Sequence, residues 1–350
     1  MKKIMALCLS LLMLASLLPG AYAEKETVNV FNWEDYINKD VIALFEKETG
    51  IKVNYMNFTT NEDMMVQIRT STGAFDVVFP SDYCIERLIK EDLLEPIDYD
   101  SVPNAANTMD RLKNPSYDPG GVYSVPYMWG TVGILYDTTR VKGPIDSWGA
   151  LFSEDYKGEV FMLDSIRDTV GLALKYLGYS MNTRDLPALQ AATALLIKQK
   201  ADGVVKAYQV DETKDKMVAG EGTLAVVWSG DAQYAINLND KLAYVVPKEG
   251  SNVWVDAMIV PKTAKNKENA MKFINFLCRP DIAQMNCEYI EYSSPNVKAV
   301  ELMGDAYQNN PGLNPSKETI DNCEFFNDIN DFLPIYNTLW AQVKNTKIGR

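Results

Sequence analysis

The pattern of apolar and polar residues predicts strands and helices in alternation along the chain. Residues 28–31 are typical of a buried strand, because valine and phenylalanine favour extended, packed segments, and a helix over about 39–49 should end at Gly50. Further strands are expected at 51–55, 75–79, 122–129, 130–136, 160–163, 223–228 and 253–260. Further helices are expected over about 61–70, 81–93, 169–177, 186–200, 266–278 and 334–344, and at the segments that begin near Asp231 and at Pro280.

This alternation predicts an α/β fold with a largely parallel sheet. At 350 residues the chain is long enough for two lobes. Residues 122–136 form a long run of apolar and small residues, which suits a crossing between lobes. A second α/β unit should begin near Asp146.

The N-terminus predicts a cleavable secretory signal peptide at residues 1–23. Two lysines precede the apolar stretch 4–18, and A-Y-A at 21–23 matches an A-x-A cleavage site. The apolar stretch is short for a membrane span, no later stretch reaches about 18 apolar residues, and Cys8 lies too early for a lipoprotein anchor. We therefore expect a periplasmic protein that is not embedded in the membrane.

The mature chain should be acidic, and it contains no histidine. Removal of residues 1–23 leaves 32 basic and 47 acidic residues, 32 − 47 = −15. This balance argues against nucleic acid and favours either a cationic ligand or simple solubility. The lack of histidine excludes Ser-His-Asp and Cys-His nucleophiles and histidine-ligated metals. Cys84, Cys278, Cys287 and Cys323 lack C-x-x-C spacing, and their disulfide state stays open.

Aromatic rings lie close to carboxylates at the ends of three predicted strands. These groups are Trp33 with Asp35 and Tyr36, Trp228 with Asp231, and Trp254 with Asp256. Open α/β sheets bind ligands at the carboxyl ends of their strands. Rings attract cations and pack on methylene groups, and carboxylates pair with amines. Each group alone is equally typical of buried rings and solvated acids, but together they predict a cleft for a long cation with an apolar backbone.

With these residues the mature chain resembles the periplasmic substrate-binding proteins of bacterial polyamine ABC transporters, the spermidine/putrescine-binding family. The motifs that carry the resemblance follow one another along nearly the whole mature chain. They are N-W-E-D-Y at 32–36, K-E-T-G-I-K-V at 47–53, P-S-D-Y at 80–83, P-Y-M-W-G at 126–130, W-S-G-D at 228–231, W-V-D at 254–256, A-K-N-K-E at 264–268 and S-P-N at 294–296.

The resemblance implies two α/β lobes that close on a polyamine like a flytrap and deliver it to the permease subunits of an importer, with no cofactor or metal and no enzymatic activity. The first lobe would comprise 24–131 and 256–300, and the second 132–255 and 301–350. W-S-G-D at 228–231 resembles the putrescine-preferring branch of the family.

The resemblance also implies individual ligand-binding residues. Six rings would line the cleft, Asp168 and Asp256 would bind amines, and further acids would assist. Ser165 and Phe326 stand where spermidine binders have an aspartate and a glutamine, and Asp82, which could equally face solvent, replaces a neutral residue. The candidates are Trp33, Asp35, Tyr36, Ser81, Asp82, Tyr83, Ser165, Asp168, Trp228, Asp231, Trp254, Asp256, Tyr292 and Phe326.

Two other functions fit parts of the pattern. Paired carboxylates and tryptophan platforms also describe glycosidases, although nothing marks one carboxylate as a proton donor. A binding protein for another solute, such as a sugar or a metal, is the second alternative. The sequence leaves the preferred polyamine, the oligomeric state and the identity of the permease open.

Overall fold

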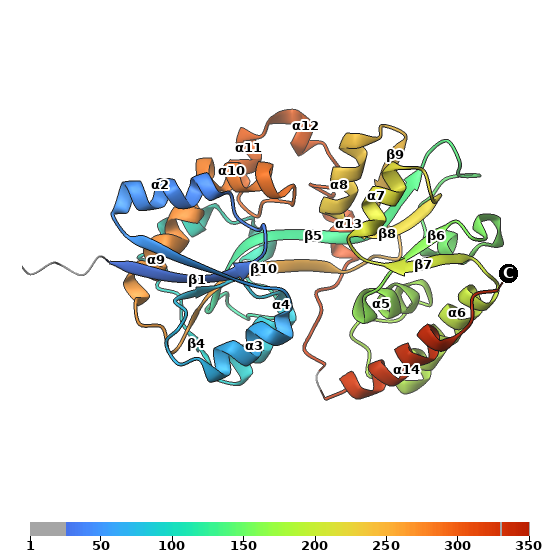
Figure 1. The fold of residues 1–350 in the computed structure, drawn as a ribbon, viewed down its shortest axis with the longest axis horizontal. Helices are drawn as coiled ribbons and strands as arrows, with labels where there is room; N and C mark the ends of the chain where they lie inside the picture. Colours follow the sequence, from blue (N-terminus) through green and yellow to red (C-terminus); the bar gives the residue numbers. More distant parts are fainter. Residues whose placement is uncertain (1–25, 330, 350) are drawn as a thin grey trace, which may run out of the picture.

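Strands and helices alternate from Thr27 onward in the computed structural model, which describes residues 26–329 and 331–349 (Figure 1). The predicted signal peptide, 1–23, lies outside the described residues. The strands are β1 (Thr27–Trp33), β2 (Lys52–Phe58), β3 (Val77–Val78), β4 (Leu94–Glu95), β5 (Ser124–Asp137), β6 (Val160–Leu163), β7 (Val205–Gln209), β8 (Leu224–Trp228), β9 (Leu242–Val245) and β10 (Val253–Pro261).

The helices flank these strands. They are α2 (Lys39–Thr49), α3 (Asn61–Thr70), α4 (Asp82–Lys90), α5 (Ile166–Tyr176), α6 (Leu186–Ala201), α7 (Glu212–Val218), α8 (Ser229–Leu238), α9 (Lys267–Leu277), α10 (Pro280–Ile290), α11 (Val297–Leu302), α12 (Gly304–Gln308), α13 (Lys317–Asp321) and α14 (Leu333–Asn345). Short 3₁₀ helices cover Pro103–Asn107, Asp110–Leu112, Trp148–Phe152 and Glu154–Tyr156. Among the residues described, no helix is both long and apolar enough to cross a membrane.

One curled sheet of mixed direction joins two halves of the molecule. Its strand order is β2-β1-β3-β10-β5-β8-β6-β7, with β4 paired to β10 and β9 to β5. β1 pairs in parallel with β2 and β3, and β6 pairs in parallel with β7 and β8, whereas β5 and β10 are antiparallel to each other. Each half therefore has its own parallel core, as the strand–helix alternation predicted.

β5 is the long element that passes from one half to the other (Figure 1). Its first part, from Ser124, pairs with β10, and its second part, from Val132, pairs with β8 and β9. The sequence predicted two extended segments here; the structure has one continuous strand, because the ladder simply changes partner near Gly130. Residues 322–329 form a further connection between the two halves. This segment runs beside the start of β10, where the amide of Val253 donates to the carbonyl of Glu324.

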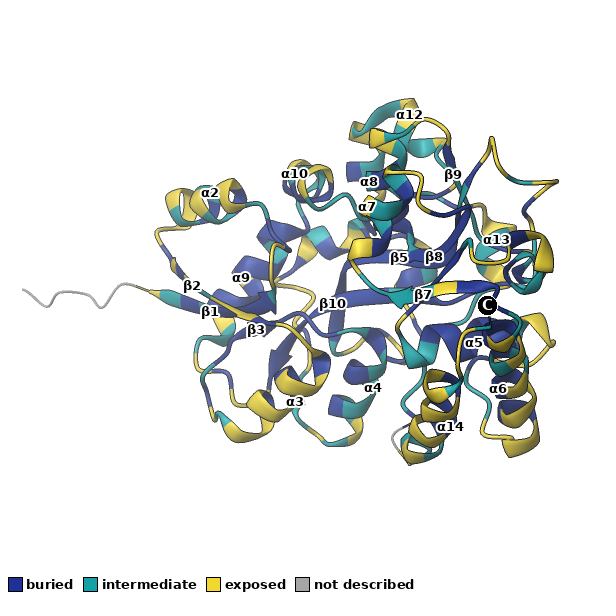
Figure 2. Cartoon of the chain, turned by 45° about the vertical axis from the view of Figure 1, so that its right-hand side comes forward, coloured by how far each residue is buried: buried dark blue, intermediate teal, exposed yellow. Residues whose placement is uncertain are grey.

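Two groups of buried side chains mark two lobes. In the first, helices α2, α9 and α10 cover one face of the sheet and α3 and α4 cover the other. In the second, α5, α6 and α14 cover one face and α7 and α8 the other. Figure 2 shows buried strands between helices whose outer faces are exposed. Apolar side chains on both faces explain why the strands are nearly continuous apolar runs.

Local signals set several element ends as the sequence predicted. Asn38 caps α2 by accepting from the amide of Asp40, and Gly50 ends the helix with a φ of 73°. Two details differ. Only Val77–Val78 of the expected strand 75–79 is regular, although its flanking amides still bond to β1. The cap of α3 is Thr60, whose hydroxyl accepts from Asp63, and this leaves the side chain of Asn61 free for another contact.

Candidate functional site

Asp256 lies at the centre of the candidate site, on β10 where the ladder to β5 shifts register. Its Oδ1 accepts a hydrogen bond of 2.7 Å from the hydroxyl of Ser81, and its Oδ2 accepts one of 2.8 Å from the hydroxyl of Tyr36. Burial raises the pKa of Asp256 to about 6, and the two hydroxyl donors moderate the rise. The carboxylate thus has its acceptor sites partly satisfied by neutral donors, and no cation among the described residues forms an ion pair with it.

Aromatic rings stand around this carboxylate. The ring of Tyr292 lies edge-on to Tyr36 at 6.1 Å and to Trp254 at 5.0 Å between centroids. Tyr36 also contacts Tyr127 at 5.7 Å. These are favourable edge-to-face geometries, which fix the orientation of the rings. Three of the predicted rings therefore form one wall beside Asp256.

Two glycines allow the rings to approach the backbone. A Cβ at Gly130 would lie 2.5 Å from Cζ2 of Trp254, and one at Gly230 would lie 2.0 Å from Cδ1 of Tyr292. Gly230 begins α8 in the second lobe, whereas Tyr292 belongs to the loop after α10 in the first. The glycines that end P-Y-M-W-G and lie within W-S-G-D therefore leave the space that these rings occupy. Tyr292 contacts both lobes.

Ser81 is held in place by a residue that the sequence did not single out. Ser81 occupies the cap position of α4, but its hydroxyl makes no capping bond and is directed to Asp256 instead. The amide of Asn61 donates to the hydroxyls of Ser81, at 3.0 Å, and of Tyr83, at 3.1 Å. Asn61 therefore orients both predicted residues.

Asp168 is a second buried carboxylate with neutral donors. The hydroxyl of Ser165 donates to its Oδ2 at 2.6 Å, and the amide of Asn252 donates to its Oδ1 at 3.3 Å. Only 5% of Asp168 is exposed, and this burial raises its pKa, against the lowering by these two hydrogen bonds. Ser165 also caps α5, so a serine can serve here by orienting Asp168. Asn252 was not predicted.

Asp82 is buried and not, as one reading had it, on the solvent side of α4. Its Oδ1 accepts from the amide of Tyr83 at 2.7 Å, and its Oδ2 has no hydrogen-bond partner among the described residues. Burial holds the pKa of Asp82 well above its usual range; the charge of Asp256 adds to the rise and that of Arg167 opposes it. Asp82 is therefore electrostatically linked to both lobes.

Arg167 is a cation of the site that the sequence reasoning missed. Its guanidinium lies over the ring of Phe326 at 4.2 Å and donates to the carbonyl of Asn327 and to Oδ1 of Asn182. Burial lowers the pKa of Arg167, and the nearby charges of Asp168 and Asp82 are among the groups that oppose this effect. The ring of Phe326 thus offers its face to a cation of the protein, a contact that a glutamine at this position could not make.

Asp231 differs from the other acids, because it already has a cationic partner. Lys214, on α7, donates to its Oδ1 at 2.8 Å. Burial raises the pKa of Asp231, and Lys214 opposes the rise. The charges of both Asp231 and Asp256 act on Tyr292, whose pKa burial already raises. Both carboxylates are therefore close enough to the Tyr292 ring for their charges to act on it.

Three predicted residues lie at the margin of this arrangement. The indole of Trp33 donates to the carbonyl of Phe79 at 2.9 Å and packs on Phe58. Trp228 ends β8, half-buried, before α8. Asp35 is exposed in a turn with a φ of 51°, and no described hydrogen bond joins it to the other candidates. The structure brings the acids and rings of both lobes together but leaves Asp35 apart.

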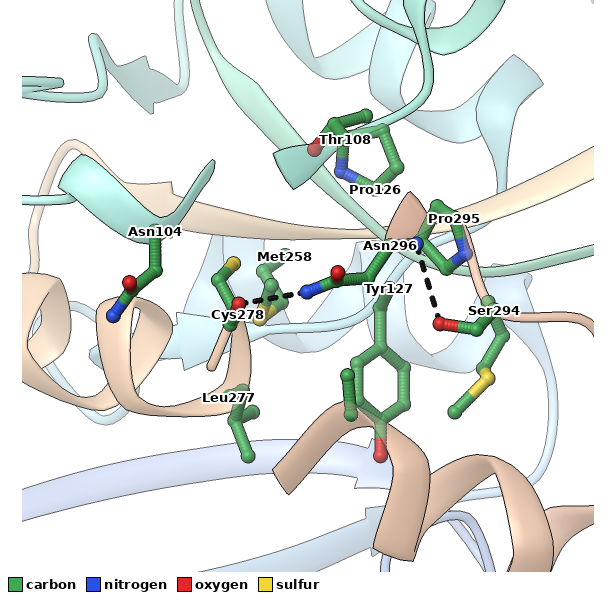
Figure 3. A pocket seen from close by; sticks show the side chains of 12 residues that line it. Asn104, Thr108, Pro126, Tyr127, Met258, Leu277, Cys278, Ser294, Pro295 and Asn296 are labelled. Carbon is green, nitrogen blue, oxygen red and sulfur yellow. Dashed lines mark hydrogen bonds between the residues drawn. The ribbon is translucent and has the colours of Figure 1, made fainter. Parts of the chain in front are cut away.

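A separate small pocket lies behind the ring of Tyr127 in the first lobe (Figure 3). Met258, Cys278 and Asn296 line it, and the amide of Asn296 donates to the carbonyl of Cys278 at 2.8 Å. None of its lining residues carries a charge. This pocket therefore does not have the chemistry to hold a cation.

Comparison with known proteins assigns the family. Residues 40–315 match the model of the bacterial extracellular solute-binding proteins. The chain belongs to this family. The extracellular solute-binding proteins are transport proteins, so the prediction of a binding protein and not an enzyme is confirmed.

Relatives of this solute-binding protein have stated ligands. The spermidine/putrescine-binding periplasmic protein of Salmonella typhimurium is 36% identical over 325 residues, covering 92% of each chain. The putrescine-binding periplasmic protein PotF of Escherichia coli is 31% identical over 313 residues, covering 84% of each chain. The solved structure of PotD from Streptococcus pneumoniae superposes with a TM-score of 0.85 at 36% identity, covering 91% of this chain and 98% of that one. PotD-type proteins are two-lobed, which confirms the predicted fold class.

Proposed function

We propose that this solute-binding protein captures a linear polyamine, putrescine or spermidine, between its lobes and presents it to an ABC importer. The observation that carries the proposal is the Asp256 carboxylate, which is 8% exposed and whose hydrogen bonds to side chains in the described part of the chain come from the hydroxyls of Ser81 and Tyr36. The rings of Trp254 and Tyr292 form the wall beside it. The relatives that bind spermidine and putrescine support it. A metal ion would need several acids around one point, and an uncharged sugar would bring no positive charge to the buried carboxylates of Asp256 and Asp168.

The binding mechanism follows from what each group offers. An ammonium group brought to Asp256 supplies the charge that the hydroxyl donors cannot, at an interaction of about 4 kcal/mol for a contact of 4 Å near a dielectric of 20, before desolvation. Trp254 and Tyr292 would pack on the methylenes between the amines. Asp168, which is also held by neutral donors, would take the second ammonium group. The hydroxyls would remain as donors and fix the carboxylate oxygens toward the ligand.

The ligand would bridge the two lobes. We propose first and second lobes close to those expected from the sequence, 24–131 with 256–300 and 132–255 with 301–350. Val253 and Val255 pack in the core of the first lobe, and Ile329 packs in the core of the second. These contacts support placing the two later lobe boundaries at about 253 and 326, instead of 256 and 300. Contacts to both lobes would favour a closed state.

Location and partners complete the proposal. Relatives named as periplasmic proteins, together with the expected signal peptide at 1–23, support a periplasmic protein. Delivery would require the permease subunits of a polyamine importer. The candidate ligand-binding residues are those given from the sequence, with Asn61 and Asn252 added as residues that orient them.

Calorimetry with Asp256→Asn tests this function. After unfolding and refolding to remove bound ligand, the native protein should bind putrescine or spermidine and return it unchanged. Removal of one partner of a desolvated charge pair costs about 2–5 kcal/mol, so the variant should bind tens-fold more weakly or worse. Asp100→Asn, at an exposed aspartate of the same lobe, is the matched control. Absence of binding heat with the native protein, or an unchanged affinity in Asp256→Asn, would refute the proposal.

A further inference from the structure

The buried acids of the site fall into two kinds according to what holds them. Asp256 and Asp168 accept from hydroxyl and amide groups, which satisfy lone pairs without supplying a positive charge. Neither has an ion-pair contact among the described residues, although the charge of Arg167 acts on Asp168. Asp231 instead meets an ammonium group, that of Lys214, at 2.8 Å. A carboxylate that already has a full positive charge against it gains less from a second one. Asp231 is therefore not equivalent to the other two as an amine anchor.

Lys214 is bound by the same chemistry that is proposed for the ligand. Its ammonium group contacts a buried carboxylate and lies 5.4 Å from the centroid of the Tyr234 ring. About 27% of its side chain is exposed, against 12% for Asp231, so the pair is partly withdrawn from water. Burial lowers the pKa of Lys214, but the hydrogen bond to Asp231 and the charges of Asp231, Asp211 and Asp215 outweigh this effect and raise it.

The position of Asp231 connects this pair to the ligand cleft. Asp231 follows Gly230, against which the ring of Tyr292 packs. That ring continues to Trp254 and Tyr36, and the hydroxyl of Tyr36 reaches Asp256. A ligand amine that extended from Asp256 along the Tyr292 ring toward Gly230 would approach the pair of Asp231 and Lys214.

We propose that Lys214 is a specificity-determining residue, whose ammonium group occupies the amine position on Asp231 and so restricts the site to ligands with two positive charges. The inference rests on the proposed function, because it names the class of polyamine that the cleft accepts. The partners of the acids support it. Among the described residues Asp231 forms an ion pair with Lys214, whereas Asp256 and Asp168 accept hydrogen bonds from neutral donors, which leaves two acids for the amines of a ligand.

A diamine matches this remainder, whereas a triamine brings one more charge than the site compensates. The third amine of spermidine would have to enter a region where Asp231 is already paired, and a buried ammonium group without a partner is costly. The native protein should accordingly bind putrescine at least as tightly as spermidine.

The test is a comparison of putrescine and spermidine affinities by calorimetry in native protein, Lys214→Met and Lys216→Met. Lys216 lies on the same helix but donates to Gln209, so its substitution removes the same charge without freeing Asp231. Lys214→Met should shift the affinity ratio toward spermidine by about tenfold or more, which corresponds to 1.4 kcal/mol. Lys216→Met should shift it less than about threefold. Asp231→Asn added to Lys214→Met should cancel the shift.

The outcomes separate the two proposals. Native protein that binds neither amine would refute the proposed function and this inference with it. The native protein could instead bind putrescine while Lys214→Met changes the ratio of putrescine to spermidine affinity by less than threefold, or by no more than Lys216→Met does. That result would refute the role of Lys214 and leave the proposed function standing. Lys214→Gln, which keeps most of the side-chain length, replaces Lys214→Met if its melting curve shows unfolding, and the same shift is then required.

Discussion

The raised pKa of Asp256 predicts that polyamine affinity falls as the medium is acidified below neutrality. Burial places this pKa at about 6, and an amine can pair only with the ionised carboxylate. For a single group with this pKa, the apparent association constant falls by the factor 1 + 10^(pKa − pH), which is about 1.1 at pH 7 and about 11 at pH 5. Putrescine should therefore bind about tenfold more weakly at pH 5 than at pH 7.

Stability of the ligand-free protein should move in the opposite direction. The pKa of Asp256 is higher in the folded state than the usual 3.8, so the folded state binds the proton more tightly. The contribution of this group to stability is therefore complete below the unfolded pKa and is lost as the pH rises through about 6. Between pH 7 and pH 5 the group alone should stabilise the folded state by about 1 kcal/mol.

Calorimetry at constant ionic strength, from pH 8 to pH 5, measures the first effect. Titrations in buffers of different ionisation enthalpy should show that binding near pH 6 releases about half a proton from Asp256. Asp256→Asn removes this part of the pH dependence, and what remains reports other groups such as Asp168, whose pKa is also raised. An affinity that stays constant from pH 7 to pH 5, or proton uptake on binding, would show that Asp256 does not hold the ligand.

Three further predictions concern packing, motion and support of the site. Gly230→Ala should weaken polyamine binding by about 1–3 kcal/mol, because its Cβ would meet the ring of Tyr292. Gly143→Ala, with no atom within 4 Å of the added Cβ, should not weaken it, and equal affinities of the two variants would refute the ring packing. Small-angle scattering should give a smaller radius of gyration with saturating putrescine, and an unchanged radius would indicate a cleft that is closed without ligand. Asn61→Ala should weaken binding by about 0.5–1.5 kcal/mol through loss of the donor to Ser81, measured by calorimetry, and an unaffected affinity would make Asn61 dispensable.

The fold was predictable because its signals are local. Apolar runs of strand length ended at polar loops, and Gly50 marked a helix end. β6, β8 and β10 therefore lie within one residue of their expected bounds, and β1 extends two residues beyond its expected end. β7 and β9 were missed for different reasons: β7 alternates apolar and polar residues and is partly exposed, whereas β9 is an apolar run of only four residues, L-A-Y-V. The continuity of β5 was missed for another reason: a strand that changes partner leaves no mark in its own sequence.

The site was predictable only in part. Rings and acids at strand ends, such as Trp254 and Asp256, can be recognised in the sequence, because an α/β sheet brings the carboxyl ends of its parallel strands to one edge. Arg167 and Lys214 give no such signal. Each is one of many cations on a helix, and what distinguishes them is the acid that the tertiary fold sets opposite. Asn61 begins the expected helix at 61–70, and nothing in the sequence marks its contacts with Ser81 and Tyr83.

What holds a buried carboxylate also says what it can still bind. Neutral donors, as at Asp256, orient the oxygens and lower the cost of burial while leaving the charge for a ligand, and burial raises the pKa to about 6 in spite of them. A resident ammonium group, as at Asp231, offsets part of the cost of burial and leaves less to gain from a ligand's amine. Selectivity among polyamines in this fold can therefore change without any change in the acids themselves, by gain or loss of a lysine such as Lys214 on a neighbouring helix.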